Sequence, residues 1–345
     1  MDLDIYKEIK IRWDRIAKPI DGLGDFEDAI CRIGGILGTA EPDIRKKALV
    51  IMCADNGIVR EGVSQCGPEV TLQVARALGM GRSTANVMAL EAGIKCFPVD
   101  IGIDHEGSIP RVIDRKIRRG SFDFLEERAL SEDQVRRAVD TGIELVHKLK
   151  REGFKLIATG EMGIGNTTTA TALLCLMADA DPLSLTGRGA GLDDRGLERK
   201  VKVIGKACEL YKRSDTDDRK ELAYDYLSAV GGLDIAGLCG LFLGGQKYGV
   251  PMVIDGFISG VAALYADAIS PGCRDCMIPS HSGREKGLGE VLKVLGLKPL
   301  INGDMALGEG TGAIMVCKLL DSAISLYDKG AGFDDNGIKE YERFT

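Results

Sequence analysis

Residues 158–174 read ATGEMGIGNTTTATALL and follow a mostly apolar run, residues 154–157, that is typical of a short buried strand. Residues 160–169 contain three glycines, one carboxylate, one asparagine and three threonines. An Ala/Leu-rich helix is expected to follow. A glycine loop between a strand and a helix N-terminus presents backbone N–H groups to an anion, usually a phosphate. Because Glu161 is unusual in a pure phosphate site, it indicates that a cationic or hydroxyl-rich group, such as a ribose, is also held there.

The rest of the chain also alternates between apolar runs typical of strands and segments typical of helices. Residues 48–54 (ALVIMCA) form a continuous apolar run, as expected of a strand buried on both faces of a parallel sheet. Further strands are expected at 94–99, 250–254 and 276–279, with helices between them. This order predicts an α/β fold with a doubly wound, mostly parallel sheet. Ligands bind at the carboxyl ends of such strands, where four acidic residues are expected: Asp55, Asp100, Glu161 and Asp255.

The two ends of the chain do not follow this alternation. Residues 3–47 are predicted to be helical, and a last helix is expected over 311–326. We expect residues 1–47 and 311–345 to pack together as a small helical domain, while residues 48–310 form the large α/β domain with the active site. Within that domain, Ser131 and Gln134 have the spacing of a capping box and predict a helix that runs to about Arg151.

Composition narrows the class of protein. The 345 residues are 45% hydrophobic and carry a net charge of −7, which argues against a nucleic-acid or anionic-membrane partner. No apolar run reaches the ~18 residues of a membrane-spanning helix, and the charged N-terminus lacks a signal-peptide core, so we expect a cytoplasmic protein.

Ten scattered cysteines fit a reducing compartment. Cys273 and Cys276 have CxxC spacing and His281 follows, but a fourth ligand is missing, so we expect no metal.

Two further glycine-rich segments carry chemical groups. TGRGAGLDD, residues 186–194, opens a helix that bears Lys200 two turns later, which suits a monoester phosphate unless the segment is only a flexible surface loop. In LGEGTG, residues 307–312, Glu309 stands between glycines before an apolar helix. It is a candidate general base, or simply a carboxylate that interacts with the helix dipole.

Other motifs are weaker. GEMGIGNTT has neither the lysine of a P-loop nor GxGxxG spacing, and it remains compatible with a tight turn whose Asn and Thr cap a helix. Asp55-Asn-Gly ends a predicted strand and is equally a good turn. Ser280-His281 resembles a nucleophile and its base, but adjacent residues seldom face each other productively and no GxSxG is present, so a Ser/His hydrolase is disfavoured.

Taken together, these segments resemble the nicotinate-nucleotide–dimethylbenzimidazole phosphoribosyltransferase family. The matching segments run in family order over most of the chain: ADNGIVREGVS, GEMGIGNTTTATAL, TGRGAGLDDRGLERK, VGGLDIAGLCG, DGFISGVAAL and LGEGTGA. The resemblance implies a Rossmann-like sheet, a small helical domain built from both chain ends, and a homodimer. It implies transfer of phosphoribose from nicotinate mononucleotide to a benzimidazole-type base without a cofactor or metal.

The resemblance also implies residue roles. Glu309 would be the general base, and Glu161 would lie near the reacting ribose carbon. The other residues fall into two groups: phosphate and ribose binding by Gly163, Asn166, Gly187, Gly189 and Lys200, and a base pocket of Asp55, Ser64, Gln73, Leu307 and Gly308. After Ser64 the chain reads QCGPEVT, without the aromatic residue common in the family and with the proline shifted by one. The accepted base therefore stays open between dimethylbenzimidazole, another benzimidazole, a purine and a phenol.

Two other functions remain possible from the sequence. One is a Mg²⁺-dependent nucleotide phosphatase or kinase, in which the carboxylates would hold the metal. The other is a non-catalytic protein that binds a nucleotide or a benzimidazole. Glu309 argues against the second alternative, because a pure binding protein has no need of a base.

Overall fold

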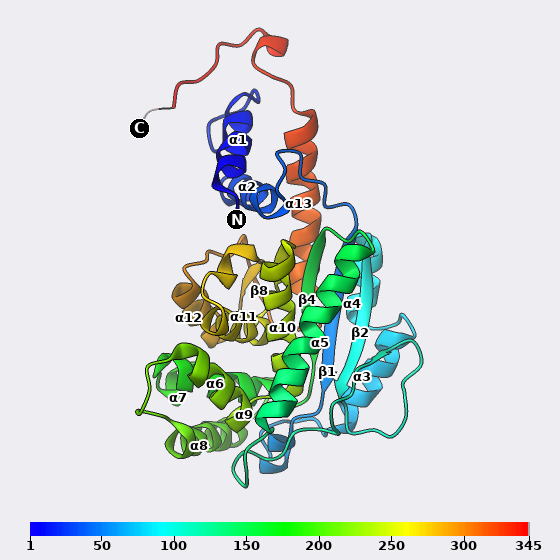
Figure 1. Cartoon of the computed structure of the whole chain (residues 1–345), viewed down its shortest axis with the longest axis vertical. Helices are drawn as coiled ribbons and strands as arrows, with labels where there is room; N and C mark the ends of the chain where they lie inside the picture. Colours follow the sequence, from blue (N-terminus) through cyan, green and yellow to red (C-terminus); the bar gives the residue numbers. More distant parts are fainter. Residues whose placement is uncertain (344–345) are drawn as a thin grey trace.

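The computed structural model describes residues 1–343 and has a six-stranded sheet at its centre (Figure 1). The strands lie in the order β3-β2-β1-β4-β5-β6, and every neighbouring pair is parallel. Their bounds are β1 Lys47–Ala54, β2 Ile94–Gly102, β3 Ile113–Asp114, β4 Leu156–Met162, β5 Met252–Ile254 and β6 Met277–Pro279. The chain order reverses between β1 and β4. The predicted doubly wound α/β fold is confirmed, and a ligand is expected at that reversal.

Helices cover both faces of the sheet, which explains the continuous apolar run of β1. Its side chains alternate between two separate cores: Val50 and Met52 belong to one, Leu49 and Ile51 to the other. One core lies under α5 (Glu132–Arg151) and α10 (Leu233–Tyr248). The other lies under α3 (Glu69–Gly79) and α4 (Thr84–Glu91). The predicted capping box is present, with Ser131 and Gln134 each accepting a backbone N–H bond at the start of α5.

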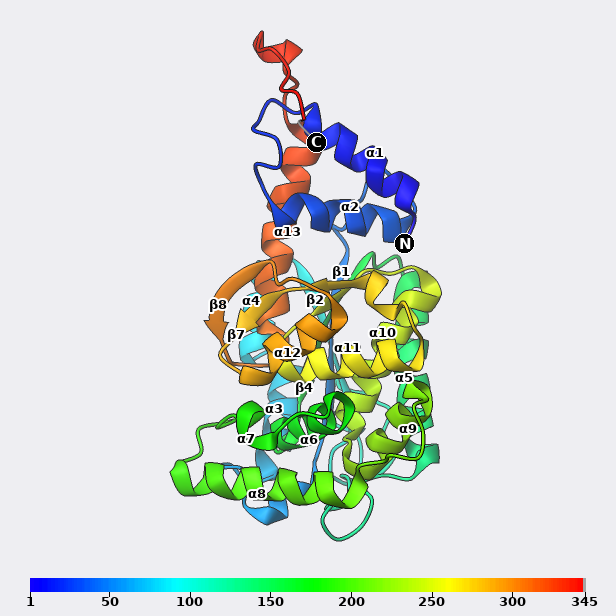
Figure 2. The same cartoon turned by 90° about the vertical axis from the view of Figure 1, so that its left-hand side faces the viewer.

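Both chain ends meet at one end of the molecule (Figure 2). The helices α1 (Leu3–Asp14), α2 (Asp25–Leu37) and α13 (Thr311–Lys329) pack together there. The buried Trp13 ring lies 5.1 Å from the Tyr327 ring, and the Tyr327 hydroxyl donates to the Ala40 carbonyl at 2.9 Å. This agrees with the expected pairing of the two ends, although residues 344–345 lie outside the described residues. The domain boundaries themselves stay a prediction.

Several elements differ from expectation. Residues 3–47 are not helical throughout, because loops follow Asp14 and Leu37. The strand β4 continues to Met162, so Glu161 lies on the strand rather than in the loop after it. Unexpected elements are helix α9 (Arg219–Val230), helix α12 (Lys286–Leu295), and a second sheet made of β7 (His281–Gly283) and β8 (Ile301–Met305). The remaining helices are α6 Asn166–Ala178, α7 Pro182–Leu185, α8 Asp194–Tyr211 and α11 Phe257–Ile269, with short 3₁₀ helices at Gly57–Glu61, Cys273–Cys276 and Asp334–Asn336.

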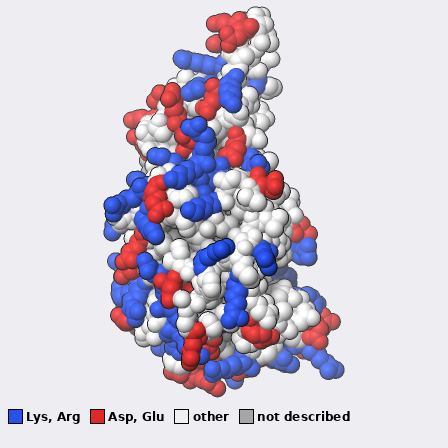
Figure 3. All heavy atoms as spheres, turned by 90° about the vertical axis from the view of Figure 1, so that its right-hand side faces the viewer, with Lys and Arg blue, Asp and Glu red and all other residues white. Residues whose placement is uncertain are grey.

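Charges of both signs are mixed over the face shown in Figure 3, and an uncharged area interrupts them. Among residues 1–343, no helix is long and apolar enough to cross a membrane. The helix α4 carries the exposed apolar side chains of Val87 and Leu90, and it packs against α13. This apolar surface matters below because α13 begins at the predicted site.

Candidate active site

A cavity of about 690 Å³ opens at the carboxyl end of β4, beside the point where the strand order reverses. It is bounded by the start of α6, the loop before α8, the start of α11 and the loop before α13. The cavity brings together nine of the twelve predicted site residues: Glu161, Gly163, Asn166, Gly187, Gly189, Lys200, Leu307, Gly308 and Glu309. Three segments that are far apart in the sequence therefore share one site.

Glu161 is buried at the end of β4 and is held by a neighbouring amide. The Asn166 side chain, in the first turn of α6, donates from Nδ2 to Glu161 and, at 3.0 Å, to Oδ2 of Asp234. Burial raises the pKa of Glu161 to about 8 and that of Asp234 to about 6, because a carboxylate loses its hydration there. Glu161 is thus mostly protonated at neutral pH before a substrate binds.

The loop that carries Glu309 lies directly against Glu161. Three consecutive residues have positive φ angles: Gly308 at 83°, Glu309 at 56° and Gly310 at 84°. A Cβ on residue 308 would lie 2.8 Å from Oε1 of Glu161, so only glycine lets the loop approach this closely. A Cβ on Gly160, one residue before Glu161, would likewise lie 2.9 Å from the Glu309 carbonyl carbon. The Glu309 loop therefore packs closely against both the Glu161 carboxylate and the backbone before it.

Asp255 anchors the other end of this loop. Its buried carboxylate accepts from the backbone N–H groups of Gly310 at 3.2 Å and Ala313 at 3.0 Å, and thereby caps α13 from another element. Glu309 is consequently not needed as the cap of its own helix. Its Oε2 instead accepts a long, 3.4 Å bond from the Ala85 N–H at the start of α4. Within residues 1–343 no other hydrogen bond holds this carboxylate, so it is available to a ligand.

The opposite side of the cavity is suited to an anion. Lys200 on α8 is buried, and its Nζ donates to the Thr167 hydroxyl at 2.7 Å. Burial lowers the pKa of Lys200 to about 8. Gly189 passes over this pair, since a Cβ there would lie 3.2 Å from Nζ. Both glycine loops thus meet at Lys200, because Thr167 belongs to the first loop and Gly189 to the second.

Three predicted base-pocket residues do not line the cavity. Asp55 is buried and accepts from the Asp104 N–H at 2.8 Å, and Gln73 is exposed on α3. The Ser64 hydroxyl accepts from the Cys66 N–H at 3.2 Å. The neighbouring Gln65 side chain reaches the second glycine loop, 3.0 Å from where a Cβ of Gly191 would be. The role of these three residues stays a prediction.

Some cavity residues went unrecognised in the sequence. Glu285 and His281 line the cavity, and Asp234 supports it from α10. Asp255 was noticed only as a carboxylate after a strand. The sequence marked His281 beside Ser280, but nothing local pointed to Asp234, which lies 68 residues from its partner Asn166.

Cys273 and Cys276 do not line this cavity. Cys273 and Cys276 are buried in a 3₁₀ helix, where the Cys276 thiol donates to the Cys273 carbonyl at 3.1 Å. Across residues 1–343, no group of three or more His, Cys, Asp or Glu is arranged to hold a metal ion. The CxxC spacing therefore has a structural explanation in the turn of this short helix.

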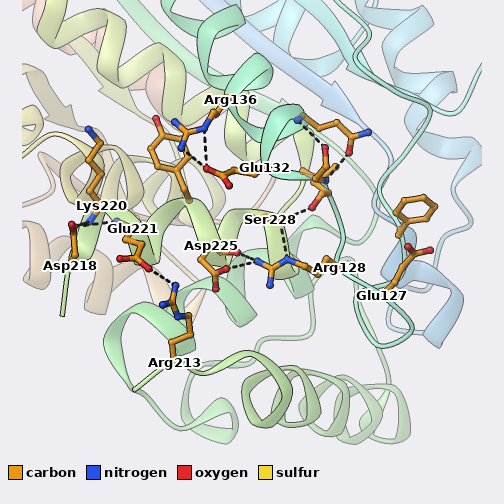
Figure 4. Close-up of a pocket in the computed structure, with 15 residues that line it drawn as sticks. Glu127, Arg128, Glu132, Arg136, Arg213, Asp218, Lys220, Glu221, Asp225 and Ser228 are labelled. Carbon is orange, nitrogen blue, oxygen red and sulfur yellow. Dashed lines mark hydrogen bonds and ion pairs between the residues drawn. The ribbon is translucent and has the colours of Figure 1, made fainter. Parts of the chain in front are cut away.

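A second cavity, of about 810 Å³, is larger but has a different character (Figure 4). It is an open groove between the α5 and α9 helices, and its charged side chains pair with one another. Arg128 contacts Asp225 at 2.7 Å, and Arg213 contacts Glu221 at 2.8 Å. Such exposed pairs contribute little energy and leave few charges for a ligand. None of the predicted site residues lines this groove.

The fold and the smaller cavity define an α/β protein that brings a buried lysine and two glutamates together in one cavity. A family model described as phosphoribosyltransferase matches residues 1–338. The chain is 40% identical, over 98% of its length and 96% of the relative, to the nicotinate-nucleotide–dimethylbenzimidazole phosphoribosyltransferase of Acetivibrio thermocellus. It is 40% identical to the enzyme of the same name from Clostridium acetobutylicum, over 99% of this chain and 96% of that protein.

A solved structure gives the same result. The crystal structure of CobT from Thermus thermophilus superposes with a TM-score of 0.91 at 33% identity, covering 98% of this chain and 100% of that one. The chain therefore belongs to the nicotinate-nucleotide–dimethylbenzimidazole phosphoribosyltransferase family, and it is a phosphoribosyltransferase. The resemblance found in the sequence is confirmed.

Proposed function

We propose that this enzyme transfers the phosphoribosyl group of nicotinate mononucleotide to 5,6-dimethylbenzimidazole or a related base. The products are α-ribazole 5′-phosphate and nicotinate. The observation that carries the proposal is the contact between the Glu309 loop and Glu161 in the cavity that also holds Lys200. One cavity thereby offers a cation for a phosphate, a carboxylate for a ribosyl cation and a second carboxylate for a proton.

The 5′-phosphate binds at the Lys200 side of the cavity. The lysine lies between Thr167 at the start of α6 and the second glycine loop, where Gly187 and Gly189 leave room for close approach. A helix N-terminus and a buried ammonium both stabilise an anion. A phosphate dianion beside Lys200 also raises the pKa of the ammonium, which keeps the lysine charged.

The ribose lies beside Glu161, Gly163 and Asn166. In nicotinate mononucleotide the pyridinium nitrogen is positive, so its approach lowers the pKa of Glu161 and the side chain ionises. As the bond between C1′ and this nitrogen breaks, the electron pair returns to the ring and nicotinate leaves with a neutral ring. Positive charge then develops on the ribose, and the buried Glu161 carboxylate stabilises it.

The incoming base lies near Leu307 and Gly308. One of its nitrogens attacks C1′ from the face opposite the leaving ring, so the β-linkage becomes an α-linkage. Glu309 takes the proton from the other nitrogen, and the atoms and charges balance without a metal. Ser64, Gln73 and Asp55 lie outside the cavity lining and are retained as candidates for the far side of the base pocket.

We also infer a homodimer formed through an apolar surface on α4 and α13. Val87 and Leu90 of α4 are 61% and 78% exposed, and Met315 and Leu319 of α13 are 46% and 40% exposed. Exposed apolar side chains on two adjacent helices are typical of a protein interface. Because α13 starts directly after Gly310, this interface would border the Glu309 loop. Ten free cysteines support a cytoplasmic location.

The direct test is an assay with nicotinate mononucleotide and a panel of bases, in which the products are identified by mass. The panel holds dimethylbenzimidazole, benzimidazole, adenine and a phenol. Release of nicotinate together with a base-linked ribose phosphate supports the proposal. Binding of the mononucleotide without release of nicotinate in any mixture would identify a binding protein instead. Activity that requires Mg²⁺ and releases inorganic phosphate would identify a phosphatase.

A further inference from the structure

His281 is a buried cavity residue to which the proposed mechanism assigns no role. It lies on β7 with 4% of its surface exposed, and it lines the same cavity as Glu161, Lys200 and Glu309. The chain has three histidines, and the other two, His105 and His147, are not buried. Its neighbour Ser280 is the other half of the pair that the sequence marked as a nucleophile and base.

The hydrogen bonds around Ser280 determine where the His281 proton lies. The Ser280 hydroxyl donates to the backbone carbonyl of Asp255 at 2.9 Å, and this carbonyl has no other donor among the described residues. The same hydroxyl oxygen lies 2.9 Å from Nδ1 of His281. Since its own proton is already used, the oxygen can only accept from His281, which places a proton on Nδ1. The two adjacent residues are thus in contact, but in a direction that does not activate the serine, which agrees with the expectation that such a pair is not productive.

The ring is also held in one orientation. A Cβ on Gly312, the second residue of α13, would lie 2.1 Å from both Nδ1 and Cε1, so the helix backbone packs directly against this edge of the ring. Burial lowers the pKa of His281, although the nearby Asp255 opposes this effect. A neutral ring with its proton on Nδ1 has an unshared electron pair on Nε2. No described residue donates to Nε2.

We propose that Nε2 of His281 accepts a hydrogen bond from a ribose hydroxyl of the mononucleotide, an inference that rests on the proposed function. The mononucleotide has few groups that can donate a hydrogen bond. Its phosphate dianion and its carboxylate only accept, and its pyridinium ring has no N–H group. The 2′- and 3′-hydroxyls are therefore the only groups that satisfy a buried acceptor. The N–H of the incoming base is the remaining donor in the reaction, and Glu309 takes that proton.

The tautomer is tested first, without any substrate. In protein labelled with ¹⁵N-histidine, three ring systems are observed, and His281 is assigned by its absence in His281→Asn. We expect a protonated Nδ1 and an unprotonated Nε2 near neutral pH. A proton on Nε2 would overturn the inference, because Nε2 could then not accept a hydrogen bond. This result does not depend on whether the enzyme turns over nicotinate mononucleotide.

The contact is tested with two matched variants. The amide of His281→Asn places a donor near the position of Nδ1 and removes the acceptor at Nε2, whereas His281→Gln places an oxygen near Nε2. Binding of nicotinate mononucleotide is measured by calorimetry without the second substrate. We expect the Asn variant to bind about tenfold more weakly, as for one lost neutral hydrogen bond, and the Gln variant to bind more tightly than the Asn variant. Unchanged affinity in the Asn variant would overturn the contact.

Deoxy analogues distinguish a ribose contact from general damage to the site. The 2′-deoxy and 3′-deoxy forms of nicotinate mononucleotide are bound to wild type and to His281→Asn. We expect one of them to bind equally well to both proteins, because the partner of Nε2 is then already missing. An equal loss for the parent compound and both analogues would show that the substitution only disturbs the fold. Wild-type turnover of nicotinate mononucleotide is measured alongside, so that failure of the proposed function is seen separately.

Discussion

Oε1 of Glu161 lies against the backbone of Gly308, so closely that a Cβ on residue 308 would be 2.8 Å from it. The residue next to Gly308 is Glu309, the proposed base. The carboxylate proposed to lie beside the ribosyl carbon therefore touches the backbone of the loop that carries the proposed proton acceptor. Such positioning is rigid, and reaction rates depend steeply on the geometry of the reacting groups.

The first prediction concerns Gly308→Ala. The new methyl group meets Glu161 and also has to adopt a φ of 83°, so the loop shifts. We expect kcat/KM to fall about 100-fold, since a displacement near 1 Å has effects of that size. The matched control is Gly296→Ala, which has a φ of 67° but no atom within 4 Å of the new Cβ. An equal loss of activity in both variants would attribute the effect to backbone strain alone.

The second prediction uses the raised pKa of Glu161. The folded state retains this proton from the ordinary pKa of 4.5 up to about 8, whereas the unfolded chain loses it near 4.5. Between these values the folded state binds more protons, so its stability relative to Glu161→Gln falls as pH rises, by up to about 1.4 kcal/mol per pH unit. The difference levels off above pH 8. Denaturant unfolding of both proteins across this pH range measures the difference in their free energies of unfolding. A difference that does not change with pH would contradict the buried proton on Glu161.

Substrate binding provides a second, independent test of the proton on Glu161. Near neutral pH the pyridinium of nicotinate mononucleotide should expel it, so binding releases a proton to the buffer. Calorimetry in two buffers of different ionisation enthalpy counts this release. Glu161→Gln serves as the control and should release less. Proton uptake by the wild type would show that Glu161 does not ionise when the substrate binds.

The elements that the sequence predicted well are those with a local pattern. A fully apolar run marks β1, which packs into a core on each face, and the Ser131 capping box marks the start of α5. The glycine segments around Glu161, Lys200 and Glu309 were recognised for the same reason, because their composition is unusual within a few residues. The cavity joins all three segments.

The parts that were missed depend on contacts between distant residues. Asp255 caps α13 across 58 positions, and Asp234 reaches Asn166 across 68. No local pattern reveals such partners. The strand β7 spans three residues, His281–Gly283, without an apolar alternation that would mark it. The end of β4 was placed too early because Gly160 and Glu161 are unusual in a strand, whereas the pairing with β1 continues to Met162.

The third prediction is that Lys200→Met raises KM for nicotinate mononucleotide at least about tenfold while kcat changes less, because the lysine binds a group that does not react. Lys200 is buried against Thr167, so the methionine, of similar length, limits the loss of packing. Lys202→Met is the control, since Lys202 is exposed on the same helix. Steady-state kinetics of all three proteins test this prediction. An unchanged KM for nicotinate mononucleotide would show that the phosphate does not bind at Lys200.

The fourth prediction separates the dimer from the fold. Leu90→Asp places a charge on the proposed apolar interface, where Leu90 is 78% exposed in one chain. We expect light scattering to show a monomer at micromolar concentration and the activity to fall with dissociation. Leu210→Asp on α8 is the control, because this leucine is also exposed, at 59%, but lies outside the interface. A dimer that survives Leu90→Asp would place the interface on another surface.

The fifth prediction concerns the proton of the incoming base. Glu309→Gln keeps the shape of the side chain and its contact near the Ala85 N–H, but the amide oxygen is far too weak a base to accept the azole proton. We expect kcat to fall about 100-fold to 10,000-fold, the range for loss of a general base, while calorimetry shows near-normal binding of nicotinate mononucleotide. The control uses an added base whose azole is already ionised at the assay pH, such as a tetrahalogenated benzotriazole. An azole anion needs no proton acceptor, so it should narrow the gap between variant and wild type. An equal gap for neutral and ionised bases would assign Glu309 to positioning rather than to proton transfer.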